Sequence, residues 1–399
     1  MLLVDVSFTA HCTAPTGVQR ITREVYRELG RQGKALPVCF DRWLGSWRLL
    51  NPGEQARLDS PSVGRYTNNR HSWSLGDAAL GTCARLLPHL FRNVGLPRGK
   101  LDGLVVPEKL ESRTPRELRM MRARISGASV AVFHDLIPVK FPQYATRRSS
   151  KEFPRYLESL LHYDGVAAVS ESSRQDLLDY WANEGVRNLP PVEAISPGTE
   201  PLFTQRAGPN DASALRPRVL MVATLEKRKN HAAVLEACEL LWTQGIDFQL
   251  TLAGRLSKDT GRDVLEQIRT LENKRRPVSW IGHIGDEELR ELYQTCRFTL
   301  HPSLYEGFGL PVLESLSAGK PCIVTDRGAL AQVAEAGGCH VLDDPTPKAV
   351  AGAIRELLLD SVLYERLVGE CRKRRFKRWD SYCDELTLWQ RSLKKRAVD

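Results

Sequence analysis

The sequence predicts an α/β protein with two domains. At 399 residues the chain is too long for one hydrophobic core and fits two domains of ordinary size. Short apolar runs alternate with amphipathic stretches, which indicates parallel strands joined by helical crossovers. The pattern restarts after the polar, turn-forming segment at residues 198–218. We therefore expect two Rossmann-like domains that face each other across a cleft, with ligands bound at the carboxyl ends of the strands.

The first half supplies strands and helices in alternation. Apolar runs typical of buried strands lie at residues 2–6, 104–106, 130–133, 166–169 and 192–195. Amphipathic stretches predict helices at residues 18–31, 151–162 and 172–181. Residues 44–100 are rich in Gly, Pro and Arg with few periodic segments, so we assign no structure to them.

The second half repeats this alternation more regularly and ends in a helix. Its expected strands are residues 218–222, 248–253, 278–280, 298–300 and 322–324. Between residues 376 and 395, apolar side chains recur at spacings of three and four, which predicts a final helix. We expect domains at residues 1–197 and 198–375, followed by a terminal segment at 376–399.

Composition and charge limit the kinds of protein that this chain can be. A hydrophobic content of 42% and a charged content of 26% are those of a globular protein. No apolar run approaches the roughly 18 residues that span a bilayer, and no signal peptide precedes Met1, so we expect a cytosolic protein. The nine cysteines include no C-x-x-C pair, which favours buried free thiols over disulfides or zinc. The net charge of +9 allows contact with nucleic acid or with an anionic membrane face.

The segment at residues 301–314 carries the clearest chemical signal. An apolar run leads through a small-residue loop, with Gly307 and Gly309, into a helix that begins near Pro311. Backbone amides at such a helix start bind anions, and the carboxylates of Glu306 and Glu314 should flank the same mouth. This combination suits a nucleotide sugar. A plain tight turn, followed by a helix with an acid near its positive end, fits the same residues.

Four blocks of the second half closely resemble the family 4 retaining glycosyltransferases, which have the GT-B architecture. In order, the blocks are residues 219–231, 250–255, 280–289 and 301–314. The resemblance implies that Arg228 and Lys229 meet the departing diphosphate. Many members carry a further basic residue where this chain has Thr224, so the grip on phosphate would depend more heavily on Arg228 and Lys229.

The resemblance also implies a role for each remaining site residue. Glu314 would hold the ribose hydroxyls and Glu306 the hydroxyls of the transferred sugar. The backbone of Phe308, Gly309 and Leu310 would contact the sugar and diphosphate. Further expected contacts are Gly254, Arg255 and Ile281 with the base, His134 beside the donor sugar, and Gly17 in the glycine loop before the first helix. A serine segment at residues 170–173 matches the family as well, and a helix N-cap explains it equally well.

The expected activity is transfer of a hexose, of mannose, rhamnose or glucose type, with retention of anomeric configuration. The acceptor would be a glycan or lipid-linked glycan of bacterial polysaccharide or O-antigen synthesis, made at the inner membrane face. No Asp-x-Asp occurs in the chain, so we expect neither a metal nor a cofactor beyond the donor. Basic residues that could contact an anionic membrane are Arg85, His89, Arg92, Arg113, Arg116, Arg119, Arg122 and Arg124.

Three alternatives stay open at this point. A nucleotide-sugar epimerase shares the two-domain plan, and a glycoside hydrolase also places two carboxylates at a site mouth. The third alternative is a basic protein that binds nucleic acid or membranes without catalysis. No RNA-binding aromatic motif or helix-turn-helix signature accompanies the basic charge, so we expect no nucleic-acid partner.

Overall fold

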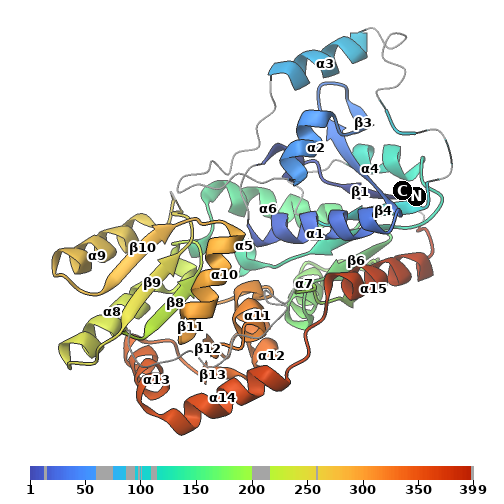
Figure 1. Ribbon diagram of the computed structural model, residues 1–399. Helices are drawn as coiled ribbons and strands as arrows, with labels where there is room; N and C mark the ends of the chain where they lie inside the picture. The colour runs from blue at the N-terminus through green and yellow to red at the C-terminus, as the bar shows by residue number, and fades with distance from the viewer. Residues whose placement is uncertain are drawn as a thin grey trace.

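The computed structural model describes residues 1–12, 16–59, 75–86, 95–97, 99, 101–108, 115–199, 216–257 and 259–396. Figure 1 shows two halves, each a twisted sheet with helices on both faces, in blue to green and in yellow to orange. The described residues leave out positions 200–215 of the predicted linker at 198–218, and the basic residues His89, Arg92 and Arg113. The domain boundary near residue 197 therefore stays a prediction.

The elements follow the expected alternation. The strands of the first half are β1 (Leu2–Asp5), β2 (Ala35–Asp41), β3 (Ser46–Leu49), β4 (Gly103–Val106), β5 (Ser129–Phe133), β6 (Gly165–Ala168) and β7 (Val192–Ala194). Its helices are α1 (Gly17–Arg31), α2 (Pro52–Asp59), α3 (Leu75–Leu86), α4 (Pro115–Arg122), α5 (Ile137–Lys140), α6 (Arg147–Leu160) and α7 (Glu171–Asn183), with the 3₁₀ turns η1 (Thr9–His11) and η2 (Pro142–Tyr144).

The strands of the second half are β8 (Arg218–Val222), β9 (Gln249–Ala253), β10 (Val278–Gly282), β11 (Phe298–His301), β12 (Cys322–Thr325) and β13 (Cys339–Leu342). Its helices are α8 (His231–Thr243), α9 (Arg262–Asn273), α10 (Asp286–Thr295), α11 (Leu310–Ser317), α12 (Ala329–Glu335), α13 (Pro347–Leu359) and α14 (Ser361–Lys373), with the 3₁₀ turn η3 (Lys227–Lys229). The final helix is α15 (Trp379–Ser392).

The first sheet has the strand order β3-β2-β1-β4-β5-β6-β7 and is parallel except at the β2–β3 pair. Alternate side chains along its strands enter two different cores. Leu3 packs in a core with residues of α4, α6 and α7, whereas Leu2 and Val4 pack with residues of α1 and α15. The sheet is thus buried on both faces, as a doubly wound parallel sheet requires.

The second sheet is parallel throughout, in the order β10-β9-β8-β11-β12-β13. Its largest core places α8, α9 and α13 on one face, while α10, α11, α12 and α14 supply smaller cores elsewhere. In both sheets the strand order reverses beside the first strand of the half. Parallel sheets with such a reversal bind ligands just beyond the carboxyl ends of the strands at that point.

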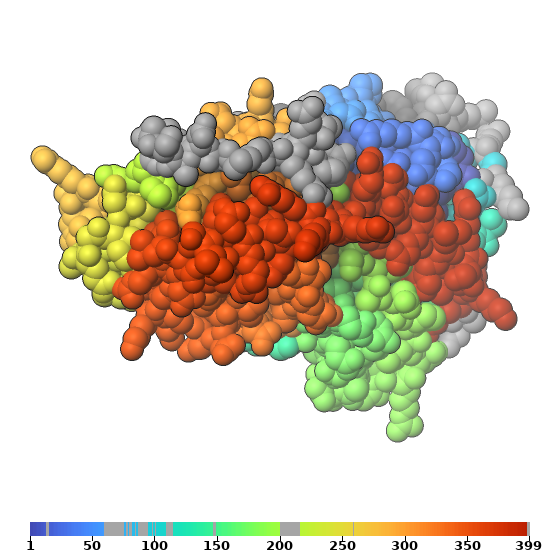
Figure 2. Space-filling model, turned by 60° about the horizontal axis from the view of Figure 1, so that its bottom comes forward, coloured from blue at the N-terminus to red at the C-terminus, as the bar shows by residue number. Residues whose placement is uncertain are grey.

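The final helix packs mainly on the first half. Trp379, Tyr382 and Leu386 of α15 lie in the same core as Leu2 and Val4 of β1. The side-chain amide of Gln390 donates to the carbonyl of Ala128 at 2.8 Å. In Figure 2 the red carboxyl-terminal segment extends from the orange half toward the blue and green half. The end of the chain therefore ties the two halves together.

Three strands were missing from the sequence prediction. Strand β2 contains Pro37, and β3 is a short antiparallel edge strand with an exposed Leu49, so neither carries a clean apolar run. Strand β13 forms the other sheet's edge and leaves Val341 exposed. Edge strands bury only part of their surface, which weakens the pattern that sequence analysis uses.

We predict that the buried face of α15 holds the first half together. Leu386 is 0% exposed and Leu388, on the same helix, is 65% exposed. Leu386→Ala should lower the free energy of unfolding by about 2–5 kcal/mol because it opens a cavity in the core. Leu388→Ala should change the free energy of unfolding by less than about 0.5 kcal/mol. Urea titration of both variants tests this, and equal effects would contradict the packing of α15.

Candidate active site

The predicted motif lies where the two halves meet. The loop after β11 runs through Gly307 and Gly309 into α11, directly opposite the end of β5. A Cβ added to Gly307 would lie 2.1 Å from the carbonyl oxygen of His134, so only glycine allows this approach. Gly309 has a φ of 114°, a left-handed conformation that glycine adopts without strain, and it caps α11.

Two serines of the first half fix this loop. The hydroxyls of Ser170 and Ser173 donate to the carbonyl of Gly307 at 2.8 and 3.1 Å. Ser170 also caps α7, since its hydroxyl accepts from the Ser173 amide at 3.0 Å. The alternative interpretation as a helix cap is therefore right for Ser170, and the same hydroxyl bridges the halves.

Tyr305 anchors the motif to the first half. Its hydroxyl donates to Asp176 and lies 3.1 Å from the hydroxyl of Ser172. The ammonium of Lys140 donates to Asp176 at 2.7 Å and lies 4.6 Å from the centre of the Tyr305 ring. The Phe141 ring packs 5.0 Å from the same ring, centre to centre. Glu306 therefore comes directly after a residue whose side chain is held by the first half.

Glu306 is the centre of a buried cluster of charges. It is 7% exposed and accepts from Arg228 at 2.8 Å and from Lys229. His301 Nε2 lies 3.2 Å from the same carboxylate. The Arg228 and Lys229 charges outweigh the effect of burial and hold the pKa of Glu306 well below its usual range. Burial lowers the pKa of Lys229, against the attraction of Glu306.

The basic loop that supplies these charges is held by backbone contacts. The carbonyl of Arg228 accepts from the Leu304 amide at 2.9 Å, and the Arg228 guanidinium donates to the Tyr305 carbonyl at 2.7 Å. Asn230 occupies the N-cap position of α8, but its side chain does not cap the helix. Asn230 has a left-handed φ of 61°, and its side-chain amide donates to Pro345, so it makes no cap hydrogen bond to α8.

Glu314 is also buried and paired. One carboxylate oxygen accepts from Arg20 of α1, and the other accepts from the Tyr293 hydroxyl at 3.0 Å. Arg20 comes from the first half, so this ion pair crosses between the halves. Sequence reasoning did not select Arg20. The sequence did contain a signal. A cation in the first turn of a helix is unfavourable toward the helix dipole, which suggests that it has an anionic partner elsewhere.

His134 and Gly17 face the motif from the first half. His134 follows β5, is 7% exposed, and its Nε2 donates to the Pro107 carbonyl at 2.8 Å. That hydrogen bond sets which ring nitrogen carries the proton. Gly17 begins α1, and a Cβ there would meet nothing within 4 Å. Protein packing therefore does not demand glycine at this position.

The structure also places the remaining residues that were predicted to contact the donor. A Cβ on Gly254 would lie 1.9 Å from the Ala223 carbonyl oxygen, so the neighbouring strand requires glycine there. The side chains of Phe308 and Leu310 pack in the core shared by β1 and α15, which leaves their backbone for a ligand. Arg255 follows β9, and Ile281 lies in β10. Their roles toward a base stay predictions.

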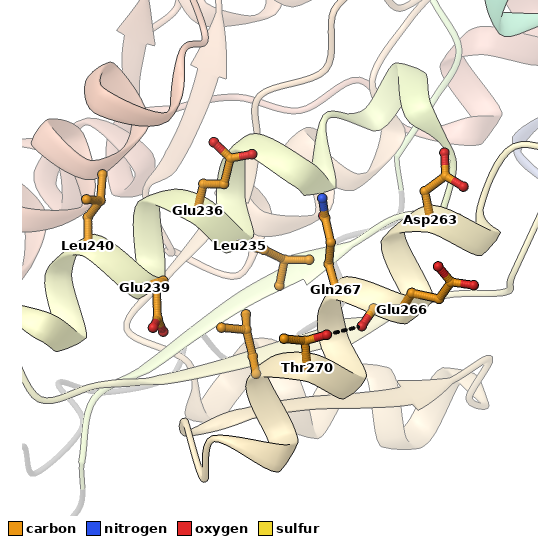
Figure 3. Close-up of a pocket in the computed structure, with 9 residues that line it drawn as sticks. Leu235, Glu236, Glu239, Leu240, Asp263, Glu266, Gln267 and Thr270 are labelled. Carbon is orange, nitrogen blue, oxygen red and sulfur yellow. Dashed lines mark hydrogen bonds between the residues drawn. The ribbon is translucent and has the colours of Figure 1, made fainter.

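A groove of about 650 Å³ lies elsewhere, between α8 and α9 (Figure 3). Its rim carries the carboxylates of Glu236, Glu239, Asp263 and Glu266 above Leu235. This acidic surface would repel a diphosphate. The charges at Glu306 and Glu314 therefore identify the better candidate site.

We predict that Glu306 is required for stability as well as for binding. Glu306→Gln removes the carboxylate paired with the buried Lys229 and one of the two paired with Arg228, which should lower the free energy of unfolding by about 3–5 kcal/mol at pH 7. The exposed Glu236 provides the control, since Glu236→Gln should change the free energy by less than about 0.5 kcal/mol.

The effect of Glu306→Gln should depend on pH. Because the folded pKa of Glu306 is depressed, its stabilisation is complete above the unfolded value, about 4.3, and is lost as pH falls through the folded pKa. The stability difference between wild type and Glu306→Gln should shrink below about pH 4. Urea titrations from pH 7 to pH 3 test this, and a constant difference would contradict the ionised cluster.

Curated relatives of this chain are sugar transferases. The chain is 27% identical to the serotype-specific mannosyltransferase WbdA of Escherichia coli, over 92% of this chain and 43% of WbdA. It is 29% identical to the O-antigen chain mannosyltransferase B of Escherichia coli, over 58% of this chain and 61% of that protein. The chain thus spans less than half the length of WbdA.

Solved structures share the fold. HepE of Anabaena, determined with UDP and glucose, matches with a TM-score of 0.66 at 17% identity, over 98% of this chain and 99% of HepE. The sucrose-phosphate synthase of Thermosynechococcus elongatus matches with a TM-score of 0.65, over 98% of both chains. These matches confirm the predicted GT-B architecture. Residues 208–374 match the family model "Glycosyl transferases group 1", as the sequence resemblance predicted.

Proposed function

We propose that this protein is a retaining glycosyltransferase that moves a hexose from a nucleotide sugar to a glycan or lipid-linked glycan. The observation that carries the proposal is the cluster of Glu306 with Arg228 and Lys229, assembled opposite His134. A nucleotide-sugar epimerase transfers no sugar to an acceptor, whereas the curated relatives are mannosyltransferases.

The cluster suits the departure of a nucleoside diphosphate. As the bond between the anomeric carbon and the phosphate oxygen breaks, negative charge grows on that oxygen. The buried cations of Arg228 and Lys229 stabilise this charge without having to reorganise. Lys229 keeps its proton as the donor enters, because the phosphates add negative charge to the surroundings that now depress its pKa.

Glu306 would then receive hydroxyls of the transferred sugar. Its carboxylate is already ionised and fixed by three side chains, so it can accept hydrogen bonds with little loss of entropy. Retention follows from a front-side path. The acceptor oxygen bonds to the anomeric carbon on the face that the phosphate leaves, and the acceptor proton passes to the departing phosphate oxygen.

The relatives favour mannose as the sugar. WbdA and the O-antigen chain enzyme are mannosyltransferases, and a Mycobacterium tuberculosis relative with 24% identity is described as GDP-mannose-dependent. HepE, in contrast, was solved with UDP and glucose. We therefore propose GDP-mannose as the first donor to test, with UDP-, dTDP- and ADP-sugars as the comparison set.

The function predicts retention and a specific dependence on Lys229. With its donor, the wild-type enzyme should form a product whose anomeric configuration equals that of the donor, as NMR of the product would show. Lys229→Gln should lower kcat by about 100-fold or more, because the lost charge acts mainly in the transition state. Lys227→Gln, next in the same loop and 55% exposed at its side chain, should stay within about twofold. Inversion, or equal rates for both variants, would refute the proposed mechanism.

We further propose that the first half meets an anionic membrane that carries the acceptor. Among the residues that the structure describes, none of the helices has the length and apolar character to cross a bilayer. Arg116, Arg119 and Arg124 are exposed on and beside α4. Arg122 was wrongly included in this surface, since it is 6% exposed and donates to Asp164 at 2.8 Å.

Vesicle sedimentation tests the membrane contact. Each basic residue near an anionic leaflet contributes about 1 kcal/mol, so changing Arg116, Arg119 and Arg124 together to Glu should abolish binding to phosphatidylserine vesicles. The control changes three exposed arginines of the second half, Arg262, Arg269 and Arg290, to Glu and removes the same total charge. Equal loss in both variants would show only a general charge effect and would contradict a defined surface.

A further inference from the structure

Arg20 occupies the carboxylate that the proposed donor would need. Both oxygens of Glu314 are engaged, one by Arg20 and the other by the Tyr293 hydroxyl. The Glu314 side chain is 4% exposed, so ribose hydroxyls can reach its remaining lone pairs only if a side chain that covers it moves. Donor binding must therefore move one of the side chains that contact Glu314.

Arg20 is the partner that can move. The Tyr293 side chain is 0% exposed and enclosed in a core with Leu220 and Cys296. The Arg20 side chain is 34% exposed, lies at the start of α1, and reaches across from the other half. Displacing Tyr293 would open a cavity, whereas displacing Arg20 only turns a flexible side chain toward solvent.

The surroundings of Arg20 contain several carboxylates. Glu314 raises the pKa of Arg20 most, and Asp286 and Glu24 add to this effect. Arg20 therefore stays charged in every state of the site. A guanidinium freed from Glu314 pairs best with phosphate, because its fork of N–H groups matches two phosphate oxygens. The diphosphate that meets Arg228 and Lys229 would also bring such oxygens into this cleft.

We propose that Arg20 is a donor-binding residue that exchanges Glu314 for the donor diphosphate. The ribose takes the Glu314 oxygen, and the released guanidinium pairs with phosphate oxygens from the opposite wall of the cleft. This inference rests on the proposed function. The exchange couples the two parts of one ligand. The nucleoside displaces Arg20 from Glu314, and the diphosphate then binds the displaced guanidinium.

The exchange predicts opposite effects on two ligands. Arg20→Met removes the competitor from Glu314, so a nucleoside without phosphates should bind severalfold more tightly than it binds wild type. The matching nucleoside diphosphate loses a charged partner and should bind tenfold or more weakly. The probes are GDP and guanosine, or whichever of UDP, dTDP and ADP stabilises the wild type most, with its own nucleoside. Isothermal titration calorimetry gives both dissociation constants.

Two further variants make the test decisive. Arg31→Met removes another arginine from α1, 70% exposed at its side chain, and should leave both affinities unchanged. Arg20→Lys keeps the charge and should recover part of the diphosphate affinity, and it replaces Arg20→Met if that variant does not fold. If Arg20 substitutions weaken both ligands by the same factor, Arg20 is a static bridge and the exchange is wrong. If no nucleoside diphosphate binds wild type, the proposed function fails, and the inference fails with it.

Discussion

The ion pairs of Glu306 with Arg228 and Lys229 are the constraint on which the site depends. Three charged side chains lie largely out of water in one place, and such a group is stable only when every charge has a partner. The loop after β11 and the basic loop after β8 must therefore keep fixed positions. A backbone hydrogen bond between Leu304 and Arg228, and the bond from the Arg228 guanidinium to the Tyr305 carbonyl, supply that rigidity. The buried cations are in this way already organised to stabilise an anion.

The same loop is held by the other half of the molecule, so neither half forms the site alone. Tyr305 is fastened to Asp176, Gly307 lies against His134, and Glu314 is paired with Arg20. Helix α15 adds a covalent tie, because it belongs to the second half by sequence and packs on the first sheet. A movement of one half relative to the other must therefore change the carboxylates directly. The proposed chemistry therefore depends on the relative position of the two halves.

Local sequence patterns predicted most helices and strands. They could not predict contacts between residues that are distant in the sequence. The strands with continuous apolar runs and the loop with Gly307 and Gly309 were legible, because periodicity and glycine content act within a few residues. The pairing of Arg20 with Glu314 spans 294 positions and depends on how two sheets meet. The side chain of Asn230 likewise donates to the distant Pro345 carbonyl rather than to the adjacent helix. Gly254 was assigned to a ligand although a neighbouring strand already requires it.

A crystal structure of the wild-type enzyme with GDP-mannose, or with the nucleotide sugar that stabilises it most, tests the central claim most directly. The account predicts phosphate oxygens within hydrogen-bond distance of Arg228 and Lys229, and sugar hydroxyls on Glu306. It also predicts that the ligand lies between His134 and α11. A nucleotide sugar bound elsewhere, such as the groove between α8 and α9, with the Glu306 cluster untouched, would contradict it.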